Sequence, residues 1–180
     1  MKQVDQLWAE GLNKQQIYQH AEQQQWNLRK VTKALAAIPE TKALQTNAKL
    51  KAFLLALLQL LVLSKWGFGF MLAEQIDSNL LISLLLPSLL PLLIMLMIYK
   101  NKVNGYLLLM VFAGYSLYQG LPYMFYLEGL VNLAASALLL ALGCYLKKRL
   151  FPFQNLFHNA ISHRGHYIFQ KVESEASKDE

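Results

Sequence analysis

The stretch AFLLALLQLLVLSKWGFGFML, residues 52–72, decides the fold class of this chain. It is apolar over about the 20 residues that a helix needs to cross a hydrocarbon core of about 30 Å. Three comparable runs follow at 80–99, 105–126 and 129–146. The sequence therefore predicts an all-α membrane protein built on a bundle of four transmembrane helices, with the lipid bilayer as its main partner.

The short connections around these runs alternate in charge. Basic residues precede the first run, separate the second from the third and follow the fourth, whereas the other two connections carry only acids. In chain order these are Lys42, Lys49 and Lys51; Glu74 and Asp77; Lys100 and Lys102; Glu128; and Lys147, Lys148 and Arg149. Cations are retained on the cytoplasmic side of short loops. The pattern predicts a multi-pass protein of a bacterial-type inner membrane, with both termini cytoplasmic and anionic lipid at that face.

Residues 1–49 are polar and predict a small cytoplasmic helical module. Asn13 and Gln16 have the spacing of a capping box, which predicts a helix from Lys14 to about Gln24. Asn27 marks a second helix start, and Pro39 ends that helix or opens the next. Candidate packing or partner-binding residues of the module are Ile17, Trp26, Val31 and Leu35, with Trp26 expected at the centre.

One local pattern in the module resembles a known family. It consists of a glycine before the first helix, an aliphatic residue, a tryptophan at the turn, and a further aliphatic residue followed by Ala-Leu. The residues are Gly11, Ile17, Ala21, Trp26, Val31, Ala34 and Leu35. This pattern resembles a ubiquitin-associated-like three-helix module, although Gln25 stands where the family has glycine. The resemblance implies a protein-docking surface and no enzyme activity. A helix-turn-helix DNA reader is the competing interpretation.

Polar residues inside the apolar runs are candidates for function. Lys65 is the most costly of them, because an intramembrane charge needs a partner or a route to water. Either its stem reaches the outer interface beside Trp66, or its ammonium faces the bundle and pairs with a carboxylate. Gln119, Asn132 and Ser136 are expected to join helices by hydrogen bonds or to line a polar pocket.

Pro87 and Pro91 lie one helical turn apart in the second run and are candidates for a hinge. Each removes an amide donor from the helix ladder. The alternative is a fixed kink that lets the helices pack.

The region after the fourth run has apolar residues at spacings of three and four. Residues 150–170 are therefore expected to form an amphipathic helix on the inner leaflet. Residues 171–180 are polar and are expected to be disordered.

The sequence holds no recognisable catalytic, cofactor-binding or metal-ligating motif. The net charge of +6 lies beside apolar runs, which favours a membrane surface over nucleic acid. We therefore expect a non-catalytic scaffold, accessory or regulatory subunit that recruits a cytoplasmic protein partner through residues 1–49. The alternative is a small transporter or pore component acting as a homo-oligomer, and an integral membrane enzyme ranks third.

Overall fold

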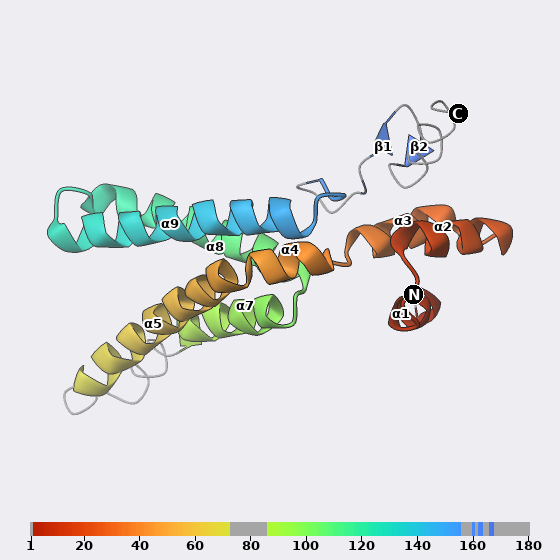
Figure 1. The fold of residues 1–180 in the computed structure, drawn as a ribbon. Coiled ribbons are helices and arrows are strands. Elements are labelled where there is room, and N and C mark those ends of the chain that lie inside the picture. Colours follow the sequence, from red (N-terminus) through yellow and green to blue (C-terminus); the bar gives the residue numbers. More distant parts are fainter. Residues whose placement is uncertain (1, 73–85, 156–159, 161, 164–165, 168–180) are drawn as a thin grey trace. The chain divides into compact units, whose positions relative to one another are not determined.

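The computed structural model describes most of the chain (Figure 1). Residues 1, 73–85, 156–159, 161, 164–165 and 168–180 lie outside the described part. The chain divides into two compact units. The first contains residues 1–40 and 151–180, and the second contains residues 41–150. Among the described residues, helices make up both units apart from one pair of two-residue strands in the first, which confirms the all-α class. The division differs from the predicted module, because residues 41–49 belong with the apolar helices.

The first unit packs three short helices around one core. They are α1 (Lys2–Ala9), α2 (Lys14–Gln23) and α3 (Leu28–Ala36). The fully buried members of the core come from all three helices: Val4, Ile17, Tyr18, Ala21, Val31, Leu35 and Ala36. Helix α1 was not predicted, although Val4, Leu7 and Trp8 have helical spacing. These three residues pack into or against the core, so α1 completes it.

The helix starts in this unit follow the capping residues. The side chain of Asn13 accepts a hydrogen bond from the Gln16 amide at 2.8 Å, and the Gln16 side chain accepts one from the Asn13 amide at 2.9 Å. This confirms the predicted capping box. The Asn27 side chain accepts from the Lys30 amide at the start of α3, which confirms the second predicted helix start.

Helix α2 ends in a Schellman turn that places Gln25 in a left-handed conformation. The Gln25 amide donates to the Glu22 carbonyl, the Trp26 amide donates to the Ala21 carbonyl, and the φ of Gln25 is 52°. This is the position at which helices favour glycine, because a Cβ atom is strained there.

Gln25→Gly is therefore expected to stabilise the first unit by about 1 kcal/mol. The Gln25 side chain is exposed, so little contact is lost. Gln24→Gly is the matched control. Gln24 has an ordinary φ of −85°, and glycine there only adds freedom to the unfolded chain. Amide exchange of α2 and α3 in the full chain measures both changes. Equal effects from the two variants would contradict the account.

The expected amphipathic helix at 150–170 is wrong for the part of this segment that the structure describes. Pro152 follows α9 directly, and Gln154 then pairs with Ala160 in an antiparallel bridge. Beyond it, β1 (Ser162–His163) and β2 (His166–Tyr167) form a two-residue antiparallel pair. The apolar spacing has another cause. Phe153 and Ala160 pack against the core of the first unit instead of lying along one helical face. The predicted disordered tail at 171–180 lies outside the described residues.

The second unit contains the apolar helices. Its elements are α4 (Thr41–Thr46), α5 (Ala48–Leu72), η1 (Leu86–Ser88), α7 (Leu89–Tyr99), α8 (Val103–Gly120), η2 (Leu121–Tyr123) and α9 (Leu127–Leu150). Each predicted run overlaps one of the longer helices. Helices α5, α8 and α9 begin before their runs, and α8 ends at Gly120 instead of at residue 126. In the second run only 86–99 is described, and there the helix starts at Leu89.

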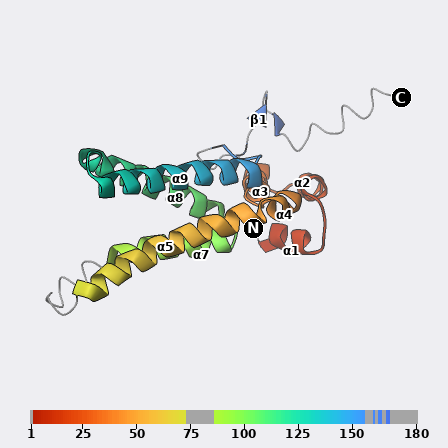
Figure 2. The ribbon, with the colours of Figure 1, turned by 60° about the vertical axis from the view of Figure 1, so that its left-hand side comes forward.

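These helices pair as antiparallel neighbours, α5 beside α7 and α8 beside α9 (Figures 1 and 2). At one end of the first pair the Lys51 amine donates to the Tyr99 carbonyl, and further along Trp66 Nε1 donates to Ser88 Oγ at 2.6 Å. Along α8 and α9, Gly120 faces Leu133, Ser116 faces Ser136 and Leu109 faces Gly143. Small residues at these points let the helix backbones approach closely.

One described helix is long and apolar enough by itself to cross a membrane, namely Gly129–Leu150 within α9. A second passes only if the segments Leu28–Thr46 and Ala48–Ser64 count as one sharply bent span. Helix α7 is apolar but shorter, with 11 residues, and the tyrosines and amides of α8 lower its hydropathy. The described helices therefore do not by themselves establish a bundle of four transmembrane helices.

Candidate functional site

The predicted packing residues of the first unit divide into core and surface. Ile17 and Leu35 expose none of their surface, and Val31 exposes 6%. All three are core residues. Ile17 and Leu35 cannot contact a partner while the unit is folded, whereas Val31 keeps a small exposed edge. Trp26 packs against this core, but it is only partly buried and lies at the edge of the core instead of at the predicted centre. The Schellman turn carries Trp26 to the rim of the core, where its ring meets His20 edge-on at 5.9 Å.

Trp26 lines a shallow groove of about 270 Å³ between α1 and α3. Its lining mixes apolar, amide and basic side chains: Gln3, Val4, Trp26, Asn27, Lys30, Val31 and Ala34. A partly exposed tryptophan is the type of side chain that most often dominates binding energy at protein interfaces. This groove is the candidate docking site of the first unit.

Lys14 is a partly buried cation of the first unit. Its amine donates to the Ile38 carbonyl at 2.7 Å and lies 5.0 Å from the centre of the Phe153 ring. Burial lowers the pKa of Lys14 from 10.5 to about 8, and the neighbouring charge of Glu40 opposes part of that shift. Sequence reasoning missed this residue, because its burial depends on Phe153, which is distant in the chain.

The lowered pKa of Lys14 makes the stability of the first unit depend on pH. Below about pH 8 the Lys14 amine is charged in the folded state, where it is poorly solvated. Between pH 8 and 10.5 this amine is protonated in the unfolded chain but neutral in the folded one, so the unfolded chain binds more protons. Stability should therefore rise across this range. We expect a gain on the order of 1–2 kcal/mol after solvent screening. Lys14→Met should remove this rise relative to wild type in urea titrations of the full chain at pH 7 and 10. An unchanged rise in the variant would contradict the assignment.

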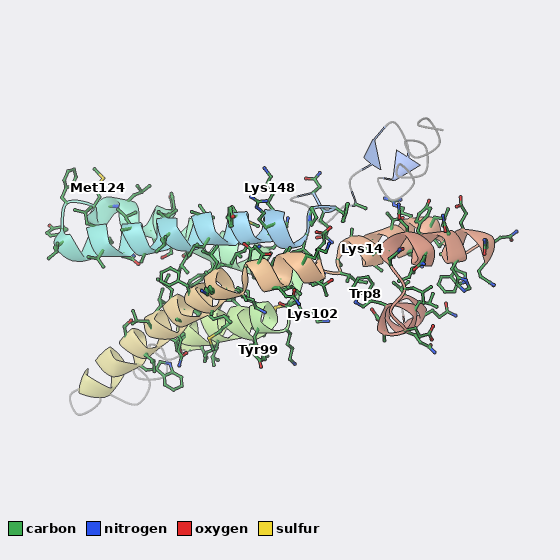
Figure 3. The ribbon with its side chains drawn as sticks, in the orientation of Figure 1. Trp8, Lys14, Tyr99, Lys102, Met124 and Lys148 are labelled. Carbon is green, nitrogen blue, oxygen red and sulfur yellow. The ribbon has the colours of Figure 1, made fainter. Side chains whose placement is uncertain are left out.

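Seven cations of the second unit gather at one end, whereas Lys42 lies in α4 and Lys65 lies further along α5. These seven lie at the start of α5, in the α7–α8 turn and at the end of α9: Lys49, Lys51, Lys100, Lys102, Lys147, Lys148 and Arg149. Figure 3 shows Lys102 and Lys148 at this end and Met124 at the opposite one. The Lys51 amine donates to Asn101 Oδ1 as well as to Tyr99, so α5 is tied to the α7–α8 turn. We call this end of the second unit the basic end.

The predicted intramembrane polar residues lie nearer the opposite end, in two groups. Ser136 is buried, and its hydroxyl donates to that of Ser116 at 2.9 Å, which joins α9 to α8. Gln119 and Asn132 are exposed and line one pocket where α8 turns into α9. The Gln119 amide donates to the Tyr115 hydroxyl at 2.5 Å. The side chain of Lys65 lies outside the described part, so neither interpretation of it is tested.

The two prolines mark the beginning of α7. Pro87 lies in η1, and Pro91 lies in the first turn of α7, where helix amides have no partner within the helix. Pro91 therefore costs no helix hydrogen bond at this position. A hinge requires helix on both sides, and residues 73–85 lie outside the described part.

Comparisons with known protein families, with curated proteins and with solved structures find no match to this chain. Within the described residues there is no cluster of three histidine, cysteine or acidic side chains suited to a metal ion. The function is therefore argued from the distribution of charge and apolar surface.

Proposed function

We propose that this chain is an integral inner-membrane protein whose four apolar segments cross the bilayer, and that it acts without catalysis as a scaffold, accessory or regulatory subunit. The observation that carries the proposal is where apolar surface is exposed. Among the described side chains, every large exposed hydrophobic residue lies between Phe53 and Tyr145, within the second unit. In water such a surface would favour aggregation, whereas in lipid it is the expected one.

Helix α9 has the length and the exposed apolar surface expected of a membrane-spanning helix. Only 28% of its apolar span is buried inside the protein, whereas the core helix of a soluble protein is mostly buried. At 1.5 Å per residue its 24 residues extend about 36 Å, enough to cross a bilayer. Its last turn carries Lys147, Lys148 and Arg149, which would lie at the anionic inner leaflet.

The two ends of the second unit support a single orientation. The basic end collects cations from three separate parts of the sequence. Exposed aromatic side chains gather at the other end of the α8–α9 pair, among them Tyr118, Tyr123, Phe125 and Tyr126. Aromatic rings are enriched at membrane interfaces. We infer that the basic end faces the cytoplasm. Because no apolar run lies between residues 1–40 and the basic start of α5, we propose that residues 1–40 are cytoplasmic as well.

A docking role for the first unit is the second part of the proposal. The groove at Trp26 supports it, and so does the ubiquitin-associated-like pattern. Gln25 occupies the glycine position of that pattern and has the left-handed backbone that glycine favours.

The test of docking is affinity purification from native membranes with wild type, Lys30→Glu and Lys33→Glu. Lys33 is an exposed lysine outside the groove, so its variant is the control. A partner lost only with Lys30→Glu supports docking; an identical set with all three contradicts it.

A small transporter or pore is the alternative. It requires polar groups along the whole length of the bundle. In the described α8–α9 interface, three apolar residues between the Ser116–Ser136 pair and the basic end are fully buried: Leu109, Ala113 and Leu139. This apolar packing leaves no polar route between these two helices of one copy, so a pore would have to lie between copies of the chain.

A further inference from the structure

The exposed amides Gln119 and Asn132 belong to a pocket of about 700 Å³ at the α8–α9 turn. Its described lining combines these amides with tyrosines, small residues and one leucine: Gln119, Gly120, Tyr123, Tyr126, Leu127, Gly129 and Asn132. This volume is in the range of small-molecule sites. None of the described lining residues is charged.

Two glycines build the pocket. A Cβ atom at Gly129 would lie 1.8 Å from the Tyr123 carbonyl oxygen, so only glycine lets η2 fold this closely onto α9. A Cβ atom at Gly120 would lie 3.2 Å from Leu133 and 3.6 Å from Asn132 Nδ2. The close backbone approach at Gly120 and Gly129 brings Tyr123 and Asn132 together at the turn between α8 and α9. The pocket is thus a defined feature of the turn.

The chemistry of the lining selects uncharged ligands rich in hydroxyl groups. Each primary amide offers two donors and an acceptor, and each phenol offers one donor and an acceptor. Neighbouring hydroxyls of a sugar or glycerol unit can both donate and accept, which matches these groups. Tyr123 and Tyr126 are 61% and 68% exposed, and a tyrosine side chain presents an apolar ring beside its polar hydroxyl.

The depth of the pocket points to the membrane interface. Asn132 lies about 7 Å along α9 from its first residue, and Gln119 is next to the last residue of α8. An exposed amide at that depth lies within reach of water and lipid headgroups, so it can hydrogen-bond to a polar group that enters the pocket. Further along the same helix interface, Ser136 donates a hydrogen bond to Ser116 at 2.9 Å, which joins α9 to α8.

We propose that this pocket binds an uncharged sugar or polyol group, presented at the outer interface. The proposal rests on the proposed membrane placement. The group has two sources, a lipid headgroup or a free solute, and both share the chemistry argued above.

The test is native mass spectrometry of the full chain in a polyoxyethylene detergent, because glycosidic detergents would compete. The probes are glucosyl diacylglycerol, diacylglycerol and phosphatidylcholine with identical acyl chains, and free methyl glucoside is the soluble competitor. We expect the glucosyl lipid to be retained about tenfold over the other two. Asn132→Leu and Gln119→Leu should each reduce that preference about tenfold, the usual effect of one lost hydrogen bond. Gln59→Leu, which changes an exposed amide in a different groove, should leave the preference unchanged.

Each outcome decides the matter. Displacement by equimolar methyl glucoside supports the site and identifies a free solute, whereas its failure to displace supports a lipid headgroup. Equal retention of the three lipids, preference for phosphatidylcholine, or an unchanged preference in both pocket variants overturns the proposal. Cysteine labelling tests membrane placement separately, so a protein that is correctly placed but shows no preference contradicts this inference alone.

Discussion

Leu35→Ala is expected to unfold the first unit of the full chain while the second unit keeps its structure. Leu35 is fully buried at the centre of the α1–α3 core, and such truncations cost about 2–5 kcal/mol. A core of this size supports a stability of only a few kcal/mol, so the loss is comparable to the whole. Hydrogen exchange measured by mass spectrometry should show α2 and α3 deprotected and α8 and α9 unchanged.

The matched control for this change is Leu28→Ala. Leu28 belongs to the same helix but is only partly buried, so its truncation should leave most of the protection in place. If Leu35→Ala and Leu28→Ala gave equal losses, the core assigned to this unit would be wrong. Loss of protection in α8 and α9 as well would show that the two units unfold together.

Gly105→Ala is expected to destabilise the second unit by about 1–3 kcal/mol, a typical cost of overpacking. A Cβ atom at position 105 would lie 2.8 Å from Met97 Cβ and 2.9 Å from the Ile98 amide nitrogen. The backbone and Cβ of α7 cannot rotate away, so α7 and α8 must separate. Thermal unfolding of the full chain in detergent measures the loss.

Gly114→Ala provides the control within the same helix. A Cβ atom at Gly114 meets nothing within 4 Å. Alanine there should stabilise α8 by up to about 1 kcal/mol through helix propensity. Opposite signs for the two alanine variants are the expected result. A loss of the same size at both positions would contradict the close approach of α7 and α8.

Local sequence signals were sufficient for much of the fold. Asn13, Gln16 and Asn27 act on amides within a few residues, so they fixed the starts of α2 and α3 without reference to the rest of the chain. The apolar runs located the long helices for the same reason, because continuous hydrophobicity is itself the signal.

The errors arose where long-range packing chooses between local options. The spacing of Phe153 and Ala160 suits a helix equally well, but both residues pack against a core formed by residues more than a hundred positions earlier. Trp26 was expected inside, yet the left-handed turn at Gln25 moves it to the rim. The pocket beside Asn132 depends on the approach of Gly129 to Tyr123, which no spacing rule predicts.

The central claim is that the second unit crosses a membrane with its basic end in the cytoplasm. Cysteine labelling in intact cells with an impermeant thiol reagent tests it most directly. The single native cysteine, Cys144, is first replaced by serine. Met124 and Lys148 are both exposed and lie at opposite ends of this unit (Figure 3). The account predicts that Met124→Cys is labelled from outside and that Lys148→Cys is labelled only after the cells are permeabilised. Labelling of Lys148→Cys in intact cells, or labelling of neither position until permeabilisation, would contradict it.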